Sequence, residues 1–196
     1  MKKLNVQKLV GIAMLAAIVV VLQFIGNSIK FGDVSISLVL LPIVVGAAIY
    51  GPSAGAILGG VFGIIIISGY LSGNVDFLWM ANPVATALVC LIKGCGAGFV
   101  SGCVYRFFAK SKISSGKVIG AYASAITCPV VNTGIFLLAM FTIFKPQLVE
   151  IAGNTNTIYF AFVALAGVNF LVELAVNVVL APVIVGVMNA IKKNKR

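Results

Sequence analysis

Histidine is absent from this sequence of 196 residues, and charged residues make up only 9% of it. The lack of histidine excludes Ser-His-Asp and Cys-His catalytic arrangements and removes a common ligand of zinc and haem. Soluble domains are typically about one quarter charged, whereas 61% of this chain is apolar. A disordered chain is excluded too, because disorder requires low hydrophobicity and high charge. An integral membrane protein remains.

Acidic residues and cysteine motifs are also scarce. Asp and Glu together number 4, against 14 Lys and Arg, which gives a net charge of +10. The 4 cysteines lie in apolar stretches and form no Cys-x-x-Cys pair, so we interpret them as small packing residues. The sequence has neither a nucleotide-binding loop nor paired acids. We therefore expect no enzymatic activity, no bound metal and no cofactor.

The sequence has long apolar runs in abundance, and we read it as one domain over residues 1–196. Open sheets cannot satisfy their backbone in lipid, so we predict an all-α integral membrane protein, a bundle of six transmembrane helices. Only the second run is shorter than about 17 residues, and we expect it to extend into residues 31–35. The predicted spans are 6–25, 36–50, 53–71, 84–108, 118–144 and 159–191.

The basic residues predict an orientation for the bundle. If the N and C termini are cytoplasmic, every Lys and Arg except Lys30, Lys93 and Lys145 falls on the cytoplasmic side. This is the positive-inside pattern of membrane proteins. Three of the four acids, Asp33, Asp76 and Glu150, then fall outside. The positive charge thus serves topology and contact with the lipid bilayer, and it does not indicate a nucleic-acid partner.

Three outer segments are rich in Gly, Asn, Ser and Thr: residues 26–35, 72–83 and 145–158. They are either plain solvated connections or a lid over an outward-facing pocket, because such segments can order around a ligand and release it. The residues alone leave both interpretations open.

Small residues recur at a spacing of four in three of the predicted helices, which places them on one face where helices can approach closely. For the glycines we predict tight internal packing, with a dimer or gating surface as the alternative. For Ala13 and Ala17, with Ala16 beside them, the residues favour internal packing over a docking face and exclude neither. The glycine series are Gly51, Gly55, Gly59, Gly63 and Gly94, Gly98, Gly102.

Two charges, Lys93 and Glu173, fall near the middle of the predicted spans. Charges at membrane depth are costly and usually functional. Lys93 lies ten residues after Pro83, about 15 Å along a helix at 1.5 Å per residue. Glu173 lies at a comparable depth in the last span. We therefore expect the two side chains to lie within reach of each other.

Polar side chains accompany both charges. Asn169 and Asn177 lie four residues before and after Glu173, so the three form a stripe on one helix face. Further candidates are Asn132 on the fifth span and Asn82 and Thr86 on the fourth. These faces should turn away from lipid and form a small substrate-binding site. The alternative is a purely structural Lys93–Glu173 pair that fixes the bundle.

The chain resembles the substrate-binding S component of an energy-coupling factor (ECF) transporter over nearly its whole length. The resemblance is carried by the six spans and five sequence features. These features are Ala13-x-x-x-Ala17, the run 36–46 with Pro42 and Gly46, the hairpin 50–55 leading to Gly59 and Gly63, Asn82-Pro83 and Lys93-Gly94.

Several expectations follow from this resemblance. S components capture a vitamin or related micronutrient outside a prokaryotic plasma membrane. A transmembrane T component and two cytoplasmic ATPase subunits then drive import in an ABC-type complex. The resemblance assigns docking of the T component to Ala13 and Ala17. Pocket residues differ between substrates in the family, so no pocket residue is carried over.

The substrate is argued from charge instead. Lys93 suits a carboxylate and favours a pantothenate-like acid, and the asparagines suit amide or hydroxyl groups. The few aromatic residues expected near the site disfavour a large flat ring. Two other functions remain: a proton-coupled, homo-oligomeric secondary transporter that uses Glu173, and a structural or regulatory membrane subunit without a ligand.

Overall fold

The computed structural model describes residues 6–28, 30–31, 34–35, 38–73, 76–111 and 115–193. Several residues used to predict the orientation, namely Lys2, Lys3, Asp33, Lys112, Lys195 and Arg196, lie outside the described residues. Residues 36–37, where the second span was predicted to begin, also lie outside them.

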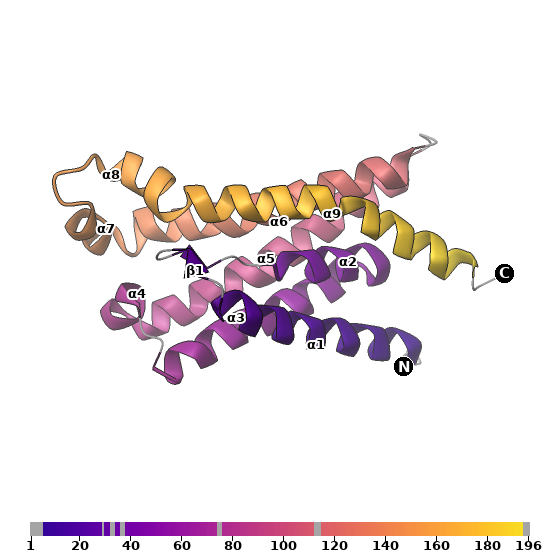
Figure 1. Ribbon diagram of the computed structural model, residues 1–196, viewed down its shortest axis with the longest axis horizontal. Helices are drawn as coiled ribbons and strands as arrows, with labels where there is room; N and C mark the ends of the chain where they lie inside the picture. The colour runs from indigo at the N-terminus through magenta and orange to yellow at the C-terminus, as the bar shows by residue number, and fades with distance from the viewer. Residues whose placement is uncertain are drawn as a thin grey trace.

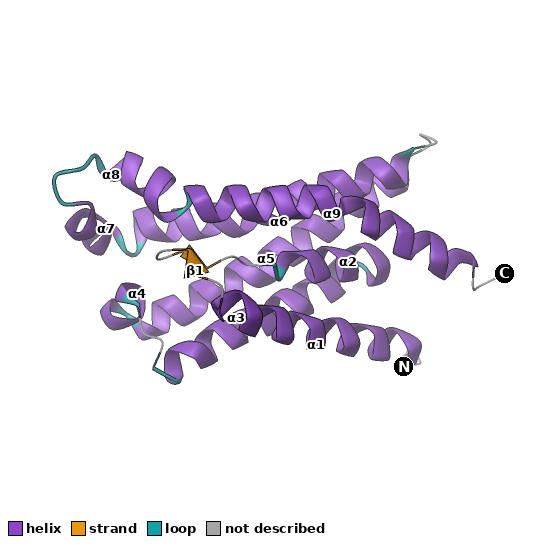
Figure 2. Ribbon diagram, in the orientation of Figure 1, coloured by secondary structure: helices purple, strands orange, loops and turns teal. Residues whose placement is uncertain are grey.

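Helices make up nearly all of the described chain, apart from two strands of two residues each (Figures 1 and 2). The first half contains α1 (Val6–Ser28), β1 (Lys30–Phe31), β2 (Val34–Ser35), α2 (Leu40–Tyr50), α3 (Pro52–Leu71) and α4 (Phe77–Ala81). The second half contains α5 (Pro83–Ala109), α6 (Gly116–Thr142), α7 (Lys145–Ala152), α8 (Thr157–Tyr159), the π-helix η1 (Phe160–Leu165) and α9 (Gly167–Lys193).

Five helices of the described chain are long and apolar enough to cross a membrane: α1, α3, α5, α6 and α9. The chain is therefore a multi-pass membrane protein. The second predicted span differs, because α2 has only 11 residues. At 1.5 Å per residue it covers about 16 Å, roughly half of a hydrocarbon core. The approach that we expected to extend it pairs Lys30 with Ser35 in an antiparallel hairpin instead.

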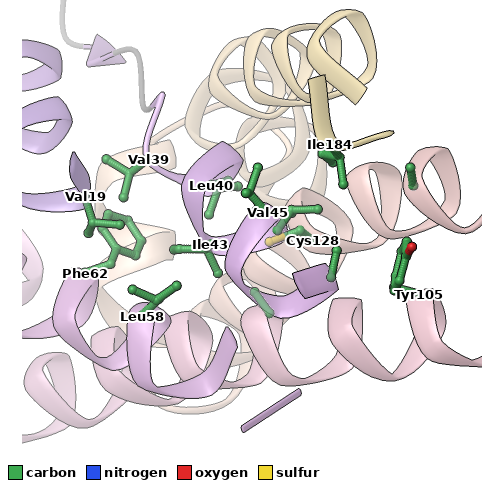
Figure 3. Close-up of a cluster of buried hydrophobic side chains, with 14 residues drawn as sticks. Val19, Val39, Leu40, Ile43, Val45, Leu58, Phe62, Tyr105, Cys128 and Ile184 are labelled. Atoms are coloured by element: carbon green, nitrogen blue, oxygen red, sulfur yellow. The ribbon is translucent and has the colours of Figure 1, made fainter. Parts of the chain in front are cut away.

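The short α2 lies in the centre of the bundle, where Leu40 and most of the residues after it are buried. Figure 3 shows side chains of α2 such as Ile43 among Val19 of α1, Phe62 of α3 and Cys128 of α6. A helix of half the membrane thickness is tolerated there, because neighbouring protein rather than lipid surrounds it.

The glycine series pack α3 against α5, as the tight-packing interpretation predicted. A Cβ added at Gly59 would fall on the carbonyl oxygen of Gly94, and one at Gly55 would fall on that of Gly98. The two backbones therefore touch, which only glycine allows. Gly51 differs from the rest of its series, because it forms the α2–α3 turn at a φ of 100°.

The two ends of the bundle have different architectures. The chain ends, the end of α5 and the start of α6 lie at one end of the long axis, while α4, α7 and α8 lie at the other (Figure 1). Within the described residues, the three outer segments are thus built from helices and a hairpin rather than from plain loops. β2 contacts α1 and α9, and α4 contacts α7. This opposite end is called the capped end below.

The last predicted span is not one uniform helix. Residues 160–165 form a π-helix, and the N–H of Ala166 bonds the carbonyl of Ala161, five residues back. A Cβ on Gly167 would lie 2.9 Å from the carbonyl oxygen of Phe162, so glycine permits this widened turn. Interruptions of this kind occur frequently at functional sites. This one lies directly before the polar stripe of α9.

Candidate binding site

The polar stripe of α9 is a hydrogen-bonded unit centred on Glu173. The amide nitrogen of Asn169 donates to Oε1 of Glu173 over 3.2 Å. The amide nitrogen of Asn177 donates to the backbone carbonyl of Glu173 over 2.8 Å. Side chains on a helix lean towards its N-terminus, so Glu173 reaches back one turn to Asn169, and Asn177 reaches back one turn to Glu173. Glu173 and Asn177 are each only 1% exposed.

Asn132 of α6 lies beside the polar stripe of α9. Its side chain is buried, faces Glu173 and lies on the helix that packs against α9. Pro129 lies inside α6 just before Asn132 and cannot donate a backbone hydrogen bond. The predicted convergence of these polar faces is therefore present for four residues, which we call the amide cluster: Asn132, Asn169, Glu173 and Asn177.

The amide cluster holds four buried oxygens without a hydrogen-bond partner. Leaving such a group unpaired costs about 1–3 kcal/mol, so four in one place is a large local penalty. Buried polar atoms of this kind call for a partner that binds there. The four atoms are Oδ1 of Asn132, Oδ1 of Asn169, Oε2 of Glu173 and Oδ1 of Asn177.

Lys93 of α5 reaches the neighbourhood of the cluster but does not pair directly with Glu173. Its ammonium lies 5.5 Å from the centre of the Phe136 ring, one turn beyond Asn132 on α6. This is a cation–π distance. Lys93 and Glu173 attract each other at longer range. The expected contact is thus replaced by an aromatic ring, which leaves the ammonium's hydrogen bonds for another group.

Asn82 and Thr86 lie apart from the amide cluster and have local roles. Asn82 is exposed and caps α5, where its Oδ1 accepts from the N–H of Ala85. The hydroxyl of Thr86 is buried and donates to the carbonyls of Leu78 and Asn82. These bonds fix α4 to the start of α5.

The capped end is closed by an apolar cluster from α4, α5, α6, α7 and η1. It includes Leu78 of α4 and Leu148 of α7, and these two helices contact each other. Its buried members are Leu78, Val89, Ala139, Met140, Phe144, Leu148 and Ala161. Burying apolar surface here excludes water from the polar groups beneath, which strengthens their electrostatic interactions.

Asp76 fastens α4 to α3 at this end. Its Oδ1 accepts from the N–H of Trp79 over 2.9 Å, and its Oδ2 accepts from the hydroxyl of Tyr70 over 2.7 Å. The rings of Tyr70 and Trp79 stack 5.0 Å apart. Asp76 thus acts as the N-cap of α4 and as its anchor.

The sequence analysis missed the aromatic side chains of this region. Phe136 contacts Lys93, and its spacing of four from Asn132 could have placed it on the same face of α6. Several more phenylalanines pack against the apolar cluster, including Phe77, Phe141 and Phe160. Phe136 therefore adds an aromatic ring beside Lys93 that the sequence-based expectation of few aromatic residues near the site did not include.

The small residues of α1 lie on its surface. Ala13 and Ala17 are exposed, whereas Ala16 is half-buried and packs against the core around α2. The exposed pair therefore does not pack inside this chain. Its side chains leave a shallow strip on α1 that a second helix could approach.

The comparisons with known proteins agree with this architecture. The family model described as "ECF transporter, substrate-specific component" matches residues 7–185. None of the curated proteins matches the chain. The chain therefore belongs to the family of ECF transporter substrate-specific components, which are transporter subunits rather than enzymes.

Proposed function

We propose that this ECF substrate-specific component captures a water-soluble vitamin or related micronutrient with high affinity at the capped end of the bundle. The observation that carries the proposal is the amide cluster, with four buried unpaired oxygens beneath an apolar cap. A substrate that donates hydrogen bonds to those oxygens removes their desolvation penalty, so binding also stabilises the folded arrangement of the site. We take Lys93 and the amide cluster as the binding set; Asn82 and Thr86 support it through α4.

We further propose six membrane-crossing elements, with α2 and its approach as the second, and both termini in the cytoplasm of a prokaryotic cell. Among the described residues, Lys8, Arg106, Lys110 and Lys117 lie at the end of the bundle that holds the chain ends. Lys145 lies at the capped end. This distribution supports the positive-inside orientation and turns the capped end outwards.

Import requires partners, because the chain has no nucleotide-binding loop. We propose a transmembrane T component and two ATPase subunits, in keeping with the family. The exposed strip of Ala13 and Ala17 supports α1 as the docking helix, since small residues let two helices approach closely in lipid. Ala16 contributes by holding α1 to the core.

For the substrate, Lys93 supports an acid, and a pantothenate-like molecule is our first candidate. The ammonium has only the Phe136 ring as a described close partner. A carboxylate would accept hydrogen bonds from this ammonium in a site that the cap shields from water.

A second candidate function is a proton-coupled, homo-oligomeric secondary transporter. The burial of Glu173 and its unpaired Oε2 favour it, since intramembrane carboxylates of this kind serve as proton relays. The two functions differ in their energy source and in their partners.

Reconstitution into vesicles separates them. We expect uptake of a labelled vitamin only when the T component, both ATPases and ATP are present, and we expect the chain to co-purify with these subunits. Uptake by the chain alone, driven by a proton gradient, would instead establish the second candidate.

A further inference from the structure

We infer that the amide cluster recognises its ligand through N–H and O–H donors on the ligand, and that it selects against groups that carry only acceptors. This inference rests on the proposed function, because it defines the class of substrate for that same site. The four unpaired buried atoms of the cluster are all oxygens.

The two hydrogen bonds within the stripe determine which atom of each amide faces Glu173 and which atom stays unpaired. The amide of Asn177 contacts a backbone carbonyl, which can only accept, so its nitrogen must face Glu173 and its oxygen must face away. Asn169 likewise directs its nitrogen at the carboxylate of Glu173. Glu173 thus accepts from the amide nitrogens of both neighbours, and their amide oxygens are left unpaired.

The arrangement of the acceptors indicates the shape of the ligand group. Asn169, Glu173 and Asn177 cover two turns of α9, about 12 Å along the axis. Asn132 adds an acceptor from α6. A ligand with several donors along one edge, such as hydroxyls, amide N–H or amino groups, complements this wall.

Lys93 adds a hydrogen-bond donor to a site whose other unpaired atoms are acceptors. Its ammonium can only donate, and it lies on α5 against Phe136 rather than on α9. A ligand that carries a donor edge and a separate acid group would satisfy both sides at once. The donor edge is the part that we assign to the amide cluster.

Three planar probes of nearly equal size test the inference on the purified full chain with Lys93→Met, which removes the ammonium that would bind a carboxylate: acetamidinium, acetamide and acetate. They carry four, two and no N–H donors, respectively. At a common concentration of about ten times the acetamidinium Kd, acetamidinium should raise the unfolding midpoint by roughly 3–5 °C. We expect this rise for acetamidinium, a smaller one for acetamide and none for acetate, against sodium chloride of equal ionic strength.

Two variants tie the effect to the cluster. In Glu173→Gln one acceptor oxygen becomes an N–H donor, and the acetamidinium shift should fall to less than half. Ser124→Ala is the matched control, because the buried Ser124 hydroxyl is already bonded to the carbonyl of Ala121; its shift should be unchanged. Equal shifts for acetate and acetamidinium, no shift for acetamidinium, or a full shift in Glu173→Gln would each overturn the inference.

Failure of this inference is distinguishable from failure of the proposed function. If ATP-driven uptake is found but acetate is the preferred probe, the importer stands and the donor selectivity is wrong. If acetamidinium is preferred but no ATP-driven uptake occurs, the selectivity stands and the importer is wrong.

Discussion

Asn169 and Glu173 lie one turn apart at the start of α9, and the amide nitrogen of Asn169 bonds the Glu173 carboxyl over 3.2 Å. The π-helix η1 ends just before them, at Leu165. The polar stripe therefore begins where the regular helix begins.

Asn177→Leu should separate stability from binding. The Glu173 carbonyl still accepts the helical N–H of residue 177, so leucine leaves nothing unpaired and removes one orphaned oxygen. We expect the ligand-free protein to be as stable or about 1 kcal/mol more stable, while ligand affinity falls. Thermal unfolding with and without ligand measures both. Lower stability together with unchanged affinity would assign Asn177 a purely structural role.

Lys93→Met should be well tolerated in folding. Breaking a direct buried ion pair costs about 3–5 kcal/mol, whereas Lys93 contacts a ring and attracts Glu173 only at longer range. We expect a loss of about 1–2 kcal/mol in stability and a loss of at least tenfold in affinity for an acidic substrate. Lys93→Arg retains the charge and serves as the control. Unchanged affinity in a well-folded Lys93→Met Glu173→Gln double variant would show that Lys93 does not bind the substrate.

The glycine contact between α3 and α5 should tolerate no side chain. Gly59→Ala places a methyl group on the Gly94 carbonyl, so the helices must separate. We expect a destabilisation of about 1–3 kcal/mol or a loss of folded protein. Gly69→Ala on the same helix meets nothing within 4 Å and should be neutral. Equal stability of the two variants, measured by thermal unfolding, would contradict the packing described here.

Much of this architecture could be predicted from the sequence, because apolar runs and four-residue spacings are local signals. The stripe Asn169–Glu173–Asn177 follows from helical periodicity. The four-residue glycine spacing predicted close packing, but the structure was needed to show that Gly59 meets Gly94. The β1–β2 hairpin and η1 could not be predicted, since tertiary contacts rather than local composition stabilise them. The ring partner of Lys93 could not be predicted, because an acid at similar depth, Glu173, is the expected partner of a buried ammonium.

The exposed strip on α1 should matter for transport and not for substrate binding. The Ala13→Leu Ala17→Leu variant fills the strip without touching the core, so binding by the isolated chain should persist while ATP-driven uptake in the complex falls at least tenfold. Ala175→Leu, at an exposed alanine of α9, is the matched control. A parallel loss of binding and uptake would show that the strip supports the fold instead.

Orientation can be tested with single cysteines on a background in which the native cysteines are replaced. Thr155→Cys lies between α7 and α8 at the capped end, and Ser111→Cys follows α5 at the opposite end. On intact cells an impermeant thiol reagent should label the first and not the second. The reverse pattern would invert the proposed topology.

The central claim is that the amide cluster holds the substrate. Native mass spectrometry of the purified chain measures this directly, by comparing the protein with its Asn132→Leu Asn177→Leu variant after identical purification from the same cells. We predict one small molecule bound per chain in the original protein and at least a tenfold lower occupancy in a variant of equal thermal stability. Equal occupancy in the two proteins, or no bound molecule in the original one, would contradict the claim.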